Sequence, residues 1–277
     1  MRTLDSHQHF WQYDPADYPW IQKDWPIRTS FLPADLEPLL QKAGFDGCVA
    51  VQARQTYRES EWLLELAQKY SFIAGVVGWV DLRSPEVCNQ LEQLKGTAKF
   101  VAVRHVVQDE PDDRFMLRDD FLRGIAVLNQ FDLAYDILIF PKQLPAGIDL
   151  VRRFPEQRFV LDHIAKPSIK DALLEPWAAQ IRELATAQNV YCKLSGMVTE
   201  ASWQTWSTKD FRPYLDIVWE AFGPDRLMIG SDWPVCLLSA EYGQTMGIVQ
   251  QYLKQFGATE REKVLGANAV RFYRLPV

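Results

Sequence analysis

The sequence predicts an α/β protein, a single (β/α)8 TIM barrel over residues 1–277 with an extended first βα loop. Eight short β-branched runs alternate with longer amphipathic stretches, which is typical of a parallel sheet covered by helices. Runs such as Cys48–Val51 and Gly75–Val80 are apolar throughout, as strands buried on both faces are. The length of 277 residues suits one barrel domain.

Each element follows from the same alternation. The expected strands are Thr3–Ser6, Gly47–Gln52, Phe72–Val80, Phe100–Val106, Ala134–Leu138, Arg158–Asp162, Val190–Leu194 and Arg226–Gly230. The expected helices are Pro33–Ala43, Ser60–Tyr70, Pro85–Leu94, Asp119–Gln130, Pro141–Arg153, Asp171–Gln188, Asp210–Phe222, Ala240–Phe256 and Glu260–Phe272. No glycine-rich turn follows the first strand, so a closed barrel is favoured over an open nucleotide-binding sheet. The Trp- and Pro-rich segment Phe10–Leu32 is the first βα loop, and we expect it to cover the barrel mouth.

Composition excludes several classes of partner. The net charge of −6 argues against nucleic acid or an anionic membrane as the main partner. No apolar run approaches the ~20 residues that cross a bilayer, and the first residues lack the apolar core of a signal peptide. We therefore expect a cytoplasmic protein, with its oligomeric state left open. The four cysteines are scattered without a C-x-x-C pair, which predicts reduced thiols.

In such barrels the functional residues lie at the carboxyl ends of the strands. The first strand ends in His7-Gln-His9, and side chains two positions apart on an extended chain point to the same side. Two neutral imidazoles side by side suit a divalent metal such as zinc. Alone, such a pair is often accidental.

Other strand ends supply further polar side chains. The fourth ends at Arg104, the fifth at Asp136, the sixth at His163 and the eighth at Asp232. His163 could be a satisfied core histidine, and the aspartate of Gly-Ser-Asp-Trp-Pro a turn residue. The chain has only four histidines, however, and three of them stand at strand ends of a barrel pattern. A chance placement of all three histidines at strand ends is much rarer than a chance placement of any one of them.

Taken together, these motifs resemble the amidohydrolase superfamily. The stretches "SHQHFW", "VRHVVQDEP", "DHIAKP", "CKLSGM" and "GSDWPV" are similar to its amidohydrolase-2 branch, which holds sugar-lactone hydrolases of the L-fuconolactonase and L-rhamnonolactonase type. The resemblance runs from residue 1 to the closing "NAVRFYRL". It implies a hydrolase that opens the ester bond of a small sugar-acid lactone.

The sequence departs from the two-metal members of that superfamily. Where these carry a bridging carboxylated Lys or Glu on the fourth strand and a His on the fifth, this chain has Arg104 and Asp136. Lys193 belongs to the seventh strand and cannot be that bridge. The resemblance leaves open one zinc held by His7, His9 and Asp232, or a hydrolase that needs no metal. A cation such as Arg104 near the site weakens metal binding.

For lactone hydrolysis, Asp232 is the expected general base, taking a proton from water and returning it to the leaving ring oxygen. The catalytic set is completed by His163 and by Arg104, whose planar fork could orient a substrate oxygen or pair with an acid. His105, which adjoins Arg104, is expected to face the helices. Candidates for substrate binding, each with packing or structural charge pairing as the alternative, are Trp11, Lys166, Lys193 and Trp233.

Two other functions share the same residues. A zinc-dependent decarboxylase of the same superfamily also uses an H-x-H pair, a His and an Asp. A non-catalytic barrel that binds a ligand or metal is the third reading, and it fits an intact set of strand-end residues poorly. Which lactone is used, and its ring size, depends on loop geometry that the sequence does not reveal.

Overall fold

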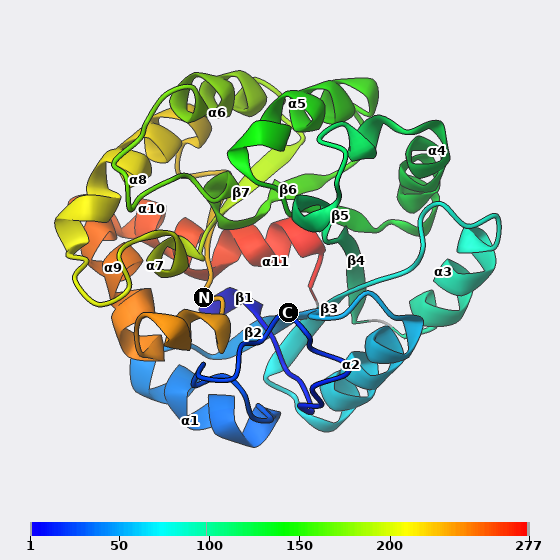
Figure 1. The fold of residues 1–277 in the computed structure, drawn as a ribbon, viewed down its shortest axis with the longest axis horizontal. Coiled ribbons are helices and arrows are strands. Elements are labelled where there is room, and N and C mark those ends of the chain that lie inside the picture. Colours follow the sequence, from blue (N-terminus) through cyan, green and yellow to red (C-terminus); the bar gives the residue numbers. More distant parts are fainter. Residues whose placement is uncertain (1, 98, 276–277) are drawn as a thin grey trace.

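The computed structural model describes residues 2–97 and 99–275, in which eight parallel strands form one sheet in the order β1 to β8 (Figure 1). The strands are β1 (Leu4–Gln8), β2 (Gly47–Val51), β3 (Ile73–Gly78), β4 (Phe100–His105), β5 (Ala134–Ile137), β6 (Phe159–Leu161), β7 (Val190–Leu194) and β8 (Leu227–Ile229). The two edges of the sheet meet where Gln8 pairs with Trp233 in a parallel bridge. The predicted (β/α)8 barrel is confirmed.

The helices are α1 (Pro33–Ala43), α2 (Tyr57–Lys69), α3 (Val87–Lys95), α4 (Asp119–Leu128), α5 (Leu144–Arg153), α6 (Trp177–Ala185), α7 (Met197–Glu200), α8 (Thr208–Phe222), α9 (Tyr242–Leu253), α10 (Ala258–Glu262) and α11 (Asn268–Tyr273). Most of them surround the strands as an outer ring, whereas α11 lies across the barrel (Figure 1). The first helix has the bounds that the sequence predicts. Most others differ from prediction by a few residues, because helix ends are set by local caps more than by apolar periodicity.

Two predicted helices differ more strongly. The helix expected from Asp171 begins only at Trp177, since Ala172 has a left-handed backbone and Pro176 disfavours helical geometry in the residue before it. The helix expected over Glu260–Phe272 is interrupted by a π-helical turn at Lys263–Ala267. There the chain runs against the amino terminus: a Cβ on Gly266 would lie 2.0 Å from the carbonyl oxygen of Arg2.

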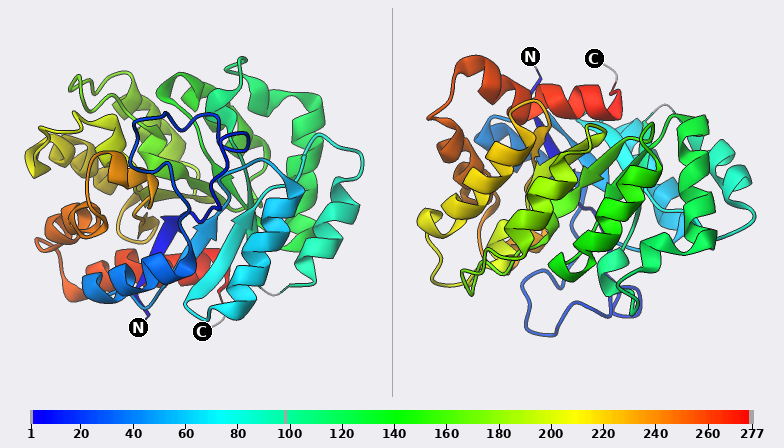
Figure 2. Two further views of the ribbon diagram at one scale, coloured as in Figure 1. Left: turned by 60° about the horizontal axis from the view of Figure 1, so that its bottom comes forward. Right: turned by 90° about the horizontal axis from the view of Figure 1, so that it is seen from above.

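The two ends of the barrel are closed differently. At the amino ends of the strands, Phe272 and Tyr273 of α11 pack with inward apolar residues such as Leu4, Val49 and Val160. The first βα loop projects from the opposite end, away from α11 (Figure 2). Its residues Trp11, Tyr18 and Ile27 form a small apolar cluster of their own. The carboxyl end, where the sequence predicts the functional residues, is therefore the end that α11 leaves open.

The expectations drawn from composition have structural counterparts. Within the described residues, no helix is long and apolar enough to cross a membrane. All four cysteines are unpaired, as the sequence predicts; Cys48, Cys192 and Cys236 are buried, whereas Cys88 is only partly buried.

Candidate active site

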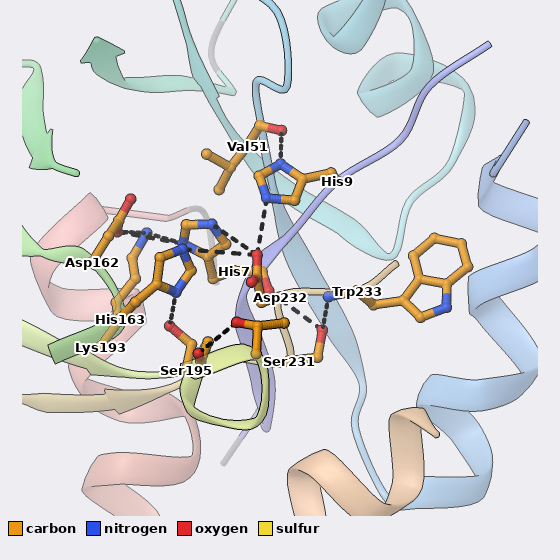
Figure 3. Close-up of polar contacts among 12 residues, drawn as sticks. His7, His9, Val51, Asp162, His163, Lys193, Ser195, Ser231, Asp232 and Trp233 are labelled. Atoms are coloured by element: carbon orange, nitrogen blue, oxygen red, sulfur yellow. Dashed lines mark hydrogen bonds and ion pairs between the residues drawn. The ribbon is translucent and has the colours of Figure 1, made fainter. Parts of the chain in front are cut away.

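Three imidazoles and one carboxylate meet at the carboxyl end of the barrel (Figure 3). The Oδ1 atom of Asp232 lies 3.2 Å from His9 Nε2, 3.8 Å from His7 Nε2 and 3.7 Å from His163 Nε2. All four side chains are buried, with at most 5% of any of them exposed. The residues come from β1 and from the segments after β6 and β8, so only closure of the barrel brings them together.

The backbone at two of these residues is left-handed. His163, Ile164, Ala165 and Lys166 form four successive residues with φ between 49° and 60°, and Asp232 has φ 57°. This conformation costs a non-glycine residue about 1–2 kcal/mol. Such a cost persists only where surrounding contacts fix the backbone, and it is found preferentially at functional sites.

Two glycines make room for the rings. A Cβ on Gly196 would lie 2.5 Å from His163 Nδ1, and Gly196 itself has φ +65°. A Cβ on Gly230 would lie 2.7 Å from the Cβ of His7. The glycines of the "CKLSGM" and "GSDWPV" stretches therefore allow His163 and His7 to approach the strands that carry Ser195 and Asp232.

The hydrogen bonds of His9 fix its tautomer. Its Nδ1 lies 2.8 Å from the carbonyl oxygen of Val51, which can only accept, so we assign the proton to Nδ1. In the neutral ring, Nε2 then turns a lone pair toward Asp232 Oδ1 at 3.2 Å. Two lone pairs at that distance repel, so a proton or a metal ion between them is favourable.

Below these rings lies a layer of buried charge. The ammonium of Lys193 is 2.5 Å from Asp136 Oδ2 and 3.0 Å from Asp162 Oδ1. Arg104 Nη1 donates to Asp162 Oδ2 at 3.2 Å and lies 3.2 Å from His7 Nε2. The Tyr273 hydroxyl of α11 donates to Asp136 at 2.8 Å. Two carboxylates thus face two cations, and the layer is close to neutral.

The surroundings of the imidazoles and of Asp232 shift their pKa values and so give them different protonation states. Burial and the nearby charge of Lys193 hold the pKa of His7 well below its usual value, and burial does the same for His163. Burial alone would raise the pKa of Asp232, but its interactions with His163 and His9 and the charge of Lys166 together lower it. At neutral pH, His7 and His163 are neutral and Asp232 is a carboxylate.

A cavity of about 620 Å³ opens above the imidazoles. His9, His163, Asp232, Arg104 and Lys166 line its floor and wall. Trp11, Trp20 and Trp25 of the first βα loop also line it, so this loop borders the mouth as the sequence predicts.

The structure does not bring Lys193 and Trp233 to the described lining of the cavity, although the sequence suggested both for substrate binding. Lys193 is completely buried in the charged layer beneath His7. Trp233, 1% exposed, packs edge-to-face on Phe10 and Phe31. A residue next to a strand-end aspartate alternates in direction, which is why proximity in sequence is misleading here.

His105 faces away from the site, as expected. Its ring stacks on Phe115 at 4.9 Å, and its Nε2 is 2.7 Å from Glu110.

Sequence reasoning missed several residues that line the cavity, among them Arg54, Glu200 and Trp203. Arg54 follows β2 and pairs with Asp17 of the first loop at 2.7 Å. Glu200 ends the short helix α7, and Trp203 follows it. The signal that could have found them is position alone, since segments after barrel strands border the mouth.

Among the described residues, two groups of side chains could hold a metal ion: His7, His9 and Asp232, and His7, Asp162 and His163. The first group suits zinc, whose tetrahedral ligands lie about 3.3–3.5 Å apart. Its oxygen-to-nitrogen separations of 3.2 and 3.8 Å are near that value. Arg104 Nη1 lies 3.2 Å from His7 Nε2 and would have to give up that contact when an ion binds. In the second group, Asp162 is paired with both Lys193 and Arg104, so two cations oppose an ion there.

The chain also matches known proteins in sequence. The profile of the amidohydrolase family, described as "Amidohydrolase", covers residues 4–275. This chain belongs to the amidohydrolase family. It is 42% identical to a protein of Burkholderia multivorans named L-fucono-1,5-lactonase, over 99% of this chain and 96% of that protein. A protein of Burkholderia ambifaria with the same name is 39% identical, over 98% and 95%.

Solved amidohydrolase structures superimpose closely on this barrel. A crystal structure of an amidohydrolase from Burkholderia multivorans with bound zinc has a TM-score of 0.96 and 42% identity, covering the whole of both chains. The resemblance seen in the sequence motifs is therefore confirmed over the full length.

Proposed function

We propose that this amidohydrolase hydrolyses a small sugar-acid lactone, such as L-fuconolactone or L-rhamnonolactone, to the open-chain acid. The observation that carries the proposal is Asp232, a carboxylate with a lowered pKa at the floor of a cavity. Its Oδ1 faces three imidazoles, whereas its Oδ2 makes no hydrogen bond to any described residue. The names of the 42% and 39% identical relatives support the lactone as substrate.

In this proposal Asp232 Oδ2 takes a proton from a water that attacks the lactone carbonyl carbon. The carbonyl oxygen becomes an oxyanion, and the cations of Arg104 and Lys166 in the cavity wall favour that charge. When the ring C–O bond breaks, Asp232 returns the proton to the departing ring oxygen. His163, held at Nδ1 by Ser195 at 2.9 Å, keeps Asp232 and the carbonyl aligned.

The donor set at the floor fits one divalent ion, and we propose that His7, His9 and Asp232 would hold it. The orientation of His9 supports this, because its unprotonated Nε2 points at Asp232. A bound zinc would supply Lewis-acid polarisation of the lactone carbonyl. The cytoplasmic location expected from the sequence stays a prediction.

The test is a panel of five- and six-membered aldonolactones with a pH indicator, using purified protein before and after treatment with a chelator. We expect acid release from at least one lactone, loss of most of the rate after chelation, and recovery with added zinc. Full activity after chelation would contradict the metal site but not the lactonase. CO2 release from an aromatic acid, with no lactone opened, would instead identify a decarboxylase of the same superfamily.

A further inference from the structure

The segment after β7 presents three residues to the cavity that the proposed chemistry does not use. Thr199, Glu200 and Trp203 line its wall. Several hydrogen bonds hold the segment: the Trp203 indole donates to Thr199 O at 2.9 Å, and the backbone N of Lys170 donates to Glu200 O at 2.9 Å. The Ser239 hydroxyl donates to Trp203 O at 3.1 Å. This part of the wall is therefore built in advance of any ligand.

Glu200 differs from the two arginines of the wall, which are both paired. Arg54 is paired with Asp17, and Arg104 with Asp162. The partly buried carboxylate of Glu200 makes no hydrogen bond or ion pair with any residue that the structure describes. Burial raises its pKa, although the charge of Lys166 opposes that rise. Such a carboxylate has lost part of its hydration, and ligand hydroxyl groups that donate to it would replace the lost hydrogen bonds.

Trp203 supplies a different kind of surface. It is 36% exposed, one of few large apolar side chains so exposed among the described residues. Its ring meets Trp25 of the first loop edge-on, with centroids 5.7 Å apart. The hydrogen bond of its Nε1 to Thr199 leaves the indole body as an apolar platform. Carboxylate and indole thus stand three residues apart on one rigid segment.

We propose that Glu200 and Trp203 recognise the polyol part of the substrate, Glu200 by accepting hydrogen bonds from two neighbouring hydroxyl groups and Trp203 by packing on the C–H face. This inference rests on the proposed lactonase function and assigns the residues that make it selective among lactones. The wall selects hydroxylated lactones over unsubstituted ones.

The experiment compares kcat/KM for a six-membered aldonolactone and for the unsubstituted six-membered lactone in the wild type, Glu200→Gln, Glu200→Ala and Trp203→Ala. Hydrogen bonds to a charged group predict a loss of about 10- to 100-fold for Glu200→Ala on the aldonolactone. The amide of Glu200→Gln keeps one acceptor oxygen, so its kcat/KM on the aldonolactone decreases less than that of Glu200→Ala. Loss of the aromatic platform predicts a decrease of about 3- to 10-fold for Trp203→Ala. On the unsubstituted ring, which has no hydroxyl group to donate to a carboxylate, both Glu200 variants stay within about threefold of the wild type.

Glu92→Gln, which removes the same charge on an exposed position of α3, is the matched control and keeps both activities. Thermal unfolding of each variant shows whether the fold is intact. Equal losses on both lactones, or unchanged selectivity in both Glu200 variants, would overturn the role of Glu200 while leaving the lactonase standing. A wild-type protein that opens neither ring would overturn the proposed function and this inference with it.

Discussion

Asp232 and Asp162 are both buried aspartates inside the barrel, yet their surroundings differ. Asp162, completely buried, has Lys193 3.0 Å from one oxygen and Arg104 3.2 Å from the other. Asp232 has only imidazoles around Oδ1, and its Oδ2 has no partner among the described residues. A carboxylate with a cation beside each oxygen holds the structure together, whereas one that has no cation beside it and faces a cavity is available for chemistry.

The largest effect is expected from Asp232→Asn. The amide cannot accept a proton from water, so lactone turnover should fall by about 10²- to 10⁴-fold, the contribution of a general base. The fold should remain, because the substitution preserves shape and removes a buried charge. Lactone hydrolysis followed by indicator, with circular dichroism and thermal unfolding, measures both.

Asp149→Asn on the outer helix α5 is the control and should change neither property. Near-normal lactonase activity in Asp232→Asn would show that Asp232 is not the general base. Asp232 and Asp162 would then not differ in function.

We expect the layer of buried charge around Asp162 to contribute mainly to the stability of the fold. Lys193→Met leaves Asp136 and Asp162 without their shared cation, and breaking such a buried pair costs about 3–5 kcal/mol. Chemical denaturation would measure this loss. The matched variant Lys142→Met breaks an exposed pair with Asp113 at 2.8 Å, and should cost less than about 1 kcal/mol. Similar losses in the two variants would contradict the structural role of Lys193.

A third buried carboxylate, Glu59, sharpens the comparison because backbone amides rather than a cation hold it. It is 5% exposed and accepts from the backbone N of Arg54 at 2.6 Å and of Ala53 at 3.3 Å. Burial raises its pKa from 4.5 to about 8. The folded protein therefore binds this proton more tightly than the unfolded chain, so the stabilisation is complete below pH 4.5 and is lost as the pH rises through about 8.

Glu59→Gln should remove this pH dependence. Between pH 5 and 7 the free energy of unfolding of the wild type should fall by about 2–3 kcal/mol relative to the variant. Denaturation curves of both proteins at several pH values measure the difference. Parallel curves would show that Glu59 is ionised in the folded state, like Asp162.

Much of this arrangement could be predicted from the sequence. Strand and helix periodicity predicts the barrel, and the chemistry of His7, His9, His163 and Asp232 points to its carboxyl end. The predicted first strand stops at Ser6, whereas β1 continues to Gln8 with a register shift against β2. Periodicity does not report such irregularities, because they depend on the neighbouring strand.

The residues around the site were harder to predict. Lys193 and Trp233 stand beside strand-end residues in sequence, but the first is covered by His7 and the second by Phe10 and Phe31. Glu200 and Trp203 carry no motif, and only the path of the segment after β7 brings them to the cavity.

The sequence by itself determined the fold class, the family and which polar side chains stand at the strand ends, because apolar periodicity and strand-end chemistry are local properties of the chain. Only the tertiary structure decided which buried charges neutralise one another and which face open space. That outcome depends on distances between residues far apart in the chain, such as the 3.2 Å between His9 and Asp232, which exist only once the barrel has closed.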